Sequence, residues 1–139
     1  FVSLASGLAL ANAGLGAVHG LAGVVGGRSG APHGLICGRL LGPVLAANAA
    51  VLAQSGADLG RFHEVAVWLA EPFGHSADEV FAALPELLDR WQVPRLGKWL
   101  TPQMDLMAIA EEAQTASSMK ANPCALPSEV LVEVIRQAL

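Results

Sequence analysis

The sequence predicts an all-α fold, a helical bundle built as a single domain over residues 1–139. Hydrophobic residues make up 53% of the chain and charged residues only 14%, against about 25% in an average soluble domain. Glycine and alanine are abundant, which is typical of closely packed helices. No segment shows the apolar–polar alternation of a half-buried strand. These three observations together favour helices throughout.

The first half of the chain predicts three apolar helices, over residues 1–13, 17–25 and 33–54. A break at Ala13-Gly14-Leu15-Gly16 separates the first two. Gly26-Gly27 is expected to end the second, because glycine is the favoured helix stop. Pro43 lies inside the third helix and is expected to bend it.

The second half predicts four more helices, over residues 58–71, 76–91, 101–111 and 127–139. Asp58 is a plausible N-cap for the first of these, and Glu71-Pro72 is expected to stop it. Ser76 and Glu79 form the pattern of a capping box, in which a serine precedes a glutamate by three residues. Thr101-Pro102 is expected to open the next helix, since proline is tolerated in a first turn.

Charge and cysteine content exclude several classes of function. The formal charge of −4 offers no basic patch, so we expect no nucleic-acid partner. Cys37 and Cys124 match neither a CxxC metal knuckle nor a disulfide framework, which favours a reduced, cytoplasmic setting.

Residues 1–27 carry no formal charge and by length alone would suit a membrane span. Polar residues and seven glycines dilute the hydrophobicity of this stretch, and no basic segment precedes it as in a signal peptide. We therefore expect no membrane segment, but a buried helix of a larger protein, of which this chain is a piece.

His19 and His33 stand fourteen positions apart in a run with almost no other polarity. On one straight helix they would lie about 21 Å apart, too far to share a metal. A turn between Gly26-Gly27 and Pro32 would fold the third helix against the second, so that the two rings face each other. Nearby glycines would leave room for close helix approach and for a ligand: Gly20, Gly23 and Gly34.

Spacing alone leaves two interpretations of this pair open. Both histidines can be core residues whose ring nitrogens bond to backbone carbonyls. Alternatively they are ligands of one metal, although two ligands are fewer than the usual three or four. A position at a helix start favours neutral imidazole at His33, which is the form that binds metals.

The segment from Asn12 to Asn48 carries an N-A-G-L-G-x-x-H-G run, a glycine pair, a P-H-G triplet and a leucine-rich helix. This pattern resembles the signature of the iron-containing alcohol dehydrogenases, the group III or type IV family. The end of the chain, with Asn122-Pro123 before a terminal helix, is similar to the family's closing region.

The resemblance implies a two-domain enzyme of which this chain is the C-terminal metal-binding domain. In the family an N-terminal α/β domain binds NAD(P), and the all-α domain holds a divalent metal, often iron or zinc. His19 and His33 match two of the four metal ligands, and an aspartate and a histidine upstream of this chain supply the others. The metal polarises the alcohol or carbonyl oxygen during hydride transfer, as a Lewis acid.

Two positions depart from the family pattern. Many members have a second histidine four residues after the first, and here that position is Gly23. The Pro-His pair common after the leucine run is replaced by Gly42-Pro43. The glycine at position 23 removes a candidate proton relay. With two of four ligands and no phosphate-binding loop, the isolated chain is expected to be inactive, to bind metal weakly and not to bind NAD(P) by itself.

A second function stays open, a stand-alone helical module for interaction or oligomerisation that has lost the chemistry. The expected partner is the missing α/β domain or a neighbouring chain that supplies it. Self-association is also expected, because a helical domain without its partner exposes an apolar face.

Other residues have simpler interpretations. We expect His63, His75 and Lys120 at the surface, and the three tryptophans in helix packing: Trp68, Trp91 and Trp99. Cys37 is expected to be a small buried residue with no base in reach.

Overall fold

The structure, a computed structural model, describes all 139 residues and contains seven α-helices and no strand, which confirms the all-α fold. The helices α1 to α7 span Val2–Ala13, Ala17–Ser29, His33–Gln54, Gly60–Phe73, Val80–Arg90, Leu106–Thr115 and Ser128–Gln137. Two single 3-10 turns complete the fold, η1 at Leu96–Lys98 and η2 at Ser117–Met119.

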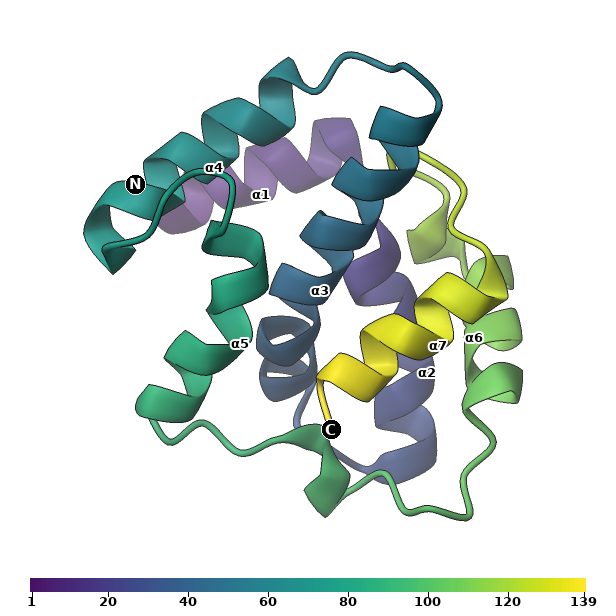
Figure 1. Cartoon of the computed structure of the whole chain (residues 1–139). Coiled ribbons are helices and arrows are strands. Elements are labelled where there is room, and N and C mark those ends of the chain that lie inside the picture. The colour runs from purple at the N-terminus through teal and green to yellow at the C-terminus, as the bar shows by residue number, and fades with distance from the viewer.

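The long helix α3 runs through the middle of the molecule (Figure 1). It packs against α5 on one side and against α2 and α7 on the other. Helix α6 packs on both α2 and α7, η2 packs on α2, and α4 contacts α5. The two helices that carry the histidines, α2 and α3, therefore have neighbours that hold them from several sides.

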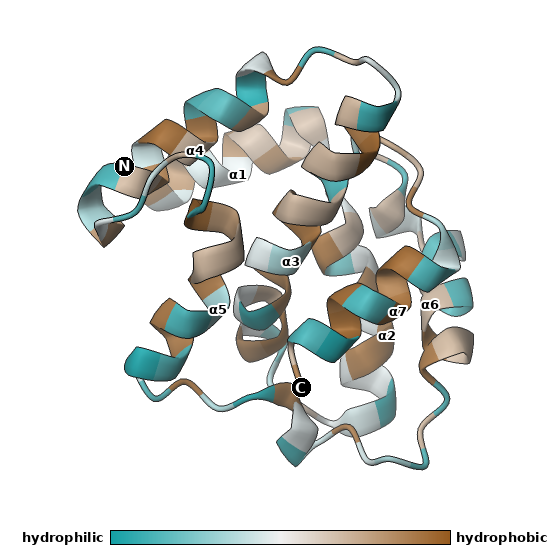
Figure 2. Ribbon diagram, in the orientation of Figure 1, coloured by the Kyte–Doolittle hydropathy of each residue, from teal (hydrophilic) through white to brown (hydrophobic).

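The main core forms where α2, α3, α6 and α7 meet, together with η1. Its fully buried aliphatic side chains include Leu21, Ile36, Leu40, Leu96, Ile109, Leu131 and Ile135. Each such side chain stabilises the fold by about 1.5–3 kcal/mol relative to exposure. In Figure 2, α7 alternates between hydrophobic and hydrophilic segments, as expected of a helix with one face in this core. A smaller core lies between α4 and α5, around Ala66, Ala70, Val80 and Phe81.

Helices α3 and α5 touch at Gly42. A Cβ atom at this position would lie 2.7 Å from the carbonyl oxygen of Phe81 and 2.8 Å from Cβ of Leu84. Only hydrogen fits between the two helices at this point. The Gly42-Pro43 pair, which departs from the family pattern, therefore has a packing role.

Helix α2 does not stop at Gly26-Gly27, so that prediction was wrong. It continues to Ser29 and ends at Gly30, which has the left-handed φ of 71° and donates its amide to Gly26. Glycine permits a helix end but does not force one, and here the first left-handed glycine sets it.

Helix α4 continues past the predicted stop at Glu71-Pro72 to Phe73. A proline in the last turn removes one hydrogen bond near the end of the helix, which is tolerated there, and Gly74 with φ 69° closes it. At its other end the cap position is Leu59, although the Asp58 carboxylate accepts a 2.9 Å hydrogen bond from the Gly60 amide.

Two later helices begin four or five residues after their predicted starts. The Ser76 hydroxyl donates to the Glu79 carboxylate at 2.6 Å instead of capping the backbone, so the capping box does not form and α5 begins at Val80. Helix α6 begins after Asp105, whose carboxylate accepts from the amides of Met107 and Ala108. This aspartate is the cap that the sequence prediction missed.

The prediction that the tryptophans lie in the core or in packing between helices is wrong for Trp68, whereas Trp91 packs against Phe73 of α4. Trp68 and Trp91 are 64% and 59% exposed, and Trp91 meets Phe73 edge-on at 5.8 Å. Trp99 does pack against the main core. His63 is exposed, as expected, and His75 is half-buried.

Helix α1 buries none of its residues. Its sequence is mostly apolar, as Figure 2 shows by the pale and brown colours along it. The exposed large hydrophobic residues at this end are Phe1, Val2, Leu4, Leu8 and Leu10.

By length and hydropathy, α3 would suit a membrane crossing, as would α1 and α2 if the pair, bent by 99°, counted as one span. Core helices of soluble proteins pass the same test, and 39% of the apolar window of α3 is buried within the bundle. The test therefore carries little weight for this chain.

Candidate metal centre

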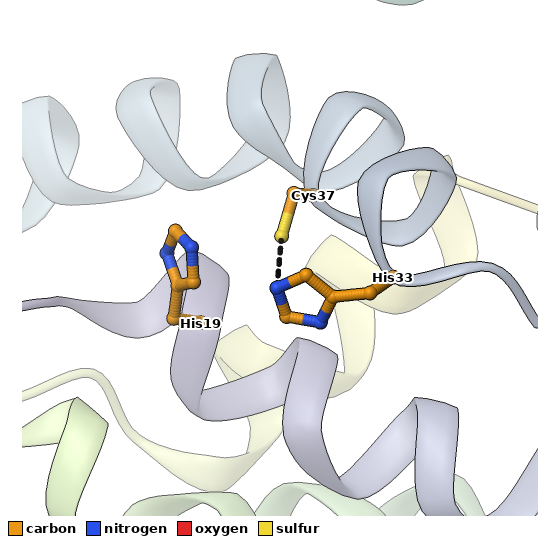
Figure 3. A group of neighbouring side chains, drawn as sticks. All are labelled: His19, His33 and Cys37. Carbon is orange, nitrogen blue, oxygen red and sulfur yellow. Dashed lines mark hydrogen bonds between the residues drawn. The ribbon is translucent and has the colours of Figure 1, made fainter. Parts of the chain in front are cut away.

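Helices α2 and α3 bring His19 and His33 together. His19 lies in the first turn of α2 and His33 is the first residue of α3. Their ring centroids are 5.5 Å apart with the planes tilted by 50°. Figure 3 shows the two imidazoles facing each other from the two helices. The chain reversal that permits this lies at residues 30–32, slightly later than predicted.

Cys37 stands beside the two rings as a third donor. Its Sγ atom lies 3.5 Å from Nε2 of His33. The ligand atoms of His19, His33 and Cys37 all lie within 4.8 Å of one another. The expectation that no base is near Cys37 was wrong, because His33 precedes it by four residues and such pairs share one helix face. The spacing was visible in the sequence.

The cluster is partly open to solvent. His33 is exposed, whereas His19 and Cys37 are half-buried. Burial raises the pKa of the Cys37 thiol, so without a metal this group is protonated and a weak nucleophile. Two imidazole nitrogens and a sulfur are donors that suit a divalent transition metal such as zinc. The residues present therefore fit a metal of that kind.

The glycines around the cluster have different roles. A Cβ atom at Gly20 would come 2.8 Å from Cε of Met119, so this glycine makes room for η2 and not for a ligand. Gly23 and Gly34 have nothing within 4 Å of a Cβ atom, so space is open beside both histidines.

Asn122 fixes the first turn of α2. Its side-chain oxygen accepts from the Ala17 amide at 3.0 Å, and its side-chain NH₂ donates to the carbonyl of Cys124 at 2.8 Å. The same amide exchanges two hydrogen bonds with Asn48, at 2.7 and 3.2 Å. Asn48 is only 3% exposed. Two asparagines distant in sequence thus hold the start of α2, and with it His19, against α3.

Arg39 anchors α3 from its other side, two residues after Cys37. It is 2% exposed and donates to the carbonyls of Pro85, Val93 and Pro94. It also pairs with Asp89 at 2.8 Å. A hydrogen bond from Arg95, together with Arg39, holds the pKa of the Asp89 carboxyl below its ordinary value. Sequence reasoning did not identify this buried arginine.

A hollow of about 500 Å³ lies elsewhere on the molecule. It is lined by residues 114, 119, 120 and 122–126 and by neither histidine. Lys120 at this hollow is exposed, as expected. The cluster of His19, His33 and Cys37 therefore lies at an open surface between α2 and α3 and not in this hollow.

Comparison with known proteins identifies one family. The family model described as "Fe-containing alcohol dehydrogenase family, C-terminal" matches residues 2–139. No curated protein and no solved structure matches the chain.

Proposed function

Since the chain belongs to the Fe-containing alcohol dehydrogenase family, as a C-terminal domain, we propose that it forms the metal-holding part of an NAD(P)-dependent alcohol dehydrogenase. The family is generally dependent on a metal and on NAD. The observation that carries the proposal is the pairing of His19 and His33, whose rings lie 5.5 Å apart on two different helices.

His19 and His33 hold the divalent metal, iron or zinc, in this proposal. When bound, the metal supplies Lewis-acid polarisation of the alcohol or carbonyl oxygen. The helices supply the positioning: Asn122 fixes the start of α2 and Arg39 anchors α3. The open space at Gly23 and Gly34 leaves room for substrate beside the two rings.

The chain's own residues do not provide the usual proton relay, because Gly23 has no side chain. We propose that water in this open space takes the place of the missing side chain and carries the proton. The nicotinamide site and the remaining ligands belong to the α/β domain, supplied upstream or by a neighbouring chain. Residues 1–139 alone then lack the hydride acceptor and are inactive. We place the protein in the cytoplasm in this proposal, because its two free cysteines would stay reduced there.

Isothermal calorimetry with Zn²⁺ tests the ligand assignment. We expect His19→Ala and His33→Ala each to weaken or abolish the binding seen with the unsubstituted chain. His63→Ala is the matched control, because His63 is an exposed histidine on α4 outside the cluster, and it should bind as the unsubstituted chain does. Equal binding by all four proteins would overturn the assignment.

Reconstitution tests the activity. The chain mixed with an α/β domain of the same family should reduce NAD(P)⁺ in the presence of a simple alcohol, and either part alone should not. Activity of residues 1–139 alone would contradict the division of labour proposed here.

An oligomerisation module is the second candidate, favoured by α1. This helix buries none of its residues, so its apolar side chains need a cover. Under this alternative the chain self-associates through α1 with no need for a metal. Light scattering across a range of concentrations distinguishes the two, because a monomer at high concentration counts against the module.

A further inference from the structure

We propose that Cys37 is a third metal ligand from this chain, so that α2 and α3 together form a site of two histidines and one thiolate. The inference rests on the proposed function, since it adds a donor to the His19–His33 pair. It also changes an expectation: the weak binding predicted from two ligands no longer follows if the chain supplies three.

The distance between Cys37 and His33 already suits a shared metal. A tetrahedral zinc site with bonds of about 2.0–2.1 Å to nitrogen and about 2.3 Å to sulfur places these two donors about 3.6 Å apart. The observed separation of Sγ and Nε2 is 3.5 Å. No separation in the cluster exceeds 4.8 Å, and tetrahedral donors lie about 3.3–3.6 Å apart, so a movement of at most about 1.5 Å completes the set. Rotation of an imidazole ring supplies a movement of that size.

The secondary structure fixes where the donors lie. His33 and Cys37 are four residues apart on α3 and so project from the same face of the helix. His19 enters from α2. The two helices are also in contact about two turns along α2 from His19, where a Cβ atom at Gly26 would lie at van der Waals distance, 3.4 Å, from Cδ1 of Ile36. Two donors from one helical turn and one from its neighbour make a rigid arrangement.

The alternative is that Cys37 merely fills space beside the core. A space-filling cysteine would turn its sulfur toward the apolar side chains. Cys37 does pack against the edge of the main core. Figure 3 shows, however, that its Sγ is directed at the His33 ring, with the His19 ring beside it, and Cys37 is only half-buried. The orientation therefore favours a ligand.

Three ligands determine the kind of metal that the site prefers. Zinc catalytic sites have three protein ligands and one open position. A thiolate is a soft ligand and favours zinc over harder cations such as Mg²⁺ or Mn²⁺. Binding replaces the S–H bond of Cys37 by an S–metal bond and releases one proton to solvent. In residues 1–139 by themselves the fourth position is open to a ligand from solvent or from the α/β domain.

Titration of the full chain with Co²⁺, followed by absorption spectroscopy, tests the proposal. Cobalt in a thiolate-containing site gives visible d–d bands and a near-ultraviolet charge-transfer band from sulfur. We expect both in the unsubstituted chain. Cys37→Ser should lose the charge-transfer band and bind at least about tenfold more weakly, since even second-shell changes cost about 10–100-fold. Cys124→Ser, a cysteine outside the cluster, should behave as the unsubstituted chain.

The outcomes separate this inference from the function on which it rests. Visible bands without the charge-transfer band would show that the histidines bind metal and Cys37 does not, which overturns only this inference. No cobalt bands at all would overturn the three-ligand site. If the chain mixed with an α/β domain of the family also gave no bands, the metal-holding function would be overturned too. A second measurement uses only the unsubstituted chain, so its result does not depend on whether Cys37→Ser folds. Zn²⁺ should slow the alkylation of Cys37 by iodoacetamide and leave Cys124 unchanged, as peptide mass spectrometry would show, and equal alkylation of Cys37 with and without Zn²⁺ would contradict the proposal.

Discussion

The imidazole rings of His19 and His33 lie 5.5 Å apart although fourteen residues separate them in the sequence. Neither helix alone could bring them together. Their meeting depends on the reversal at residues 30–32 and on the packing of α2 against α3. Contacts of these two helices with their other neighbours maintain that packing. The predictions below test those contacts.

Asn122→Ala should destabilise the fold and weaken metal binding. The substitution removes the acceptor for the Ala17 amide and for the side-chain NH₂ of buried Asn48, which costs about 1–3 kcal/mol. Urea unfolding measures the first effect and Zn²⁺ calorimetry the second. Asn12→Ala is the matched control, since Asn12 is exposed and bonds only within α1. If Asn122→Ala unfolds at the same urea concentration as Asn12→Ala, the hydrogen bonds of the Asn122 side chain do not stabilise the fold.

Gly42→Ala should destabilise the bundle. The added methyl group would meet the Phe81 carbonyl at 2.7 Å, and relief requires α3 and α5 to separate, at about 1–3 kcal/mol. Gly38→Ala, on the same helix with nothing within 4 Å, should instead be neutral or stabilising by up to about 1 kcal/mol. Thermal unfolding followed by circular dichroism would show opposite shifts in Tm. A neutral Gly42→Ala would mean that the helices are not in contact there.

Asp89 should make the stability sensitive to acid. Because Arg95 and Arg39 lower its pKa in the folded state, the unfolded chain binds a proton at this site more readily. The stability that the ionised Asp89 carboxylate adds to the fold is therefore complete above the unfolded pKa of about 3.9. It is lost as the pH falls through the lower folded pKa. Urea unfolding from about pH 6 to about pH 3 should show a smaller acid-induced loss for Asp89→Asn than for the unsubstituted chain. Parallel curves would rule out this role for Asp89.

Leu4→Gln combined with Leu8→Gln should reduce self-association. These residues are 68% and 58% exposed and lie four apart, on one face of α1. Sedimentation velocity should show a lower average mass for the double variant. Leu41→Gln, 43% exposed on α3, is the control and should leave the mass unchanged. If Leu41→Gln lowered the average mass and the double variant left it unchanged, the self-association contact would lie on α3 and not on α1.

Part of the candidate site could be predicted from the sequence. His19 and His33 are polar residues in an otherwise apolar run with a turn between them, which can be read from neighbouring residues alone. The structure places their two rings side by side. Cys37 was overlooked although its four-residue spacing from His33 is equally local. The role of Gly20 could not be predicted, because Met119, which occupies the space that its missing side chain leaves, comes from the far end of the chain.

The sequence by itself determined the class of structure and the family, because hydropathy, helix spacing and a contiguous motif are properties of neighbouring residues. Helix ends were less certain: Gly26-Gly27 and Pro72 permit a stop, but both helices run on to the first glycine with a left-handed φ, Gly30 and Gly74. Only the tertiary structure decided which groups surround His19 and His33. The bonds of Asn48 to Asn122 and of Arg39 to Asp89 join residues 74 and 50 positions apart, and such partners are chosen by how the helices pack, because a buried polar group must find its hydrogen bonds wherever the fold places it.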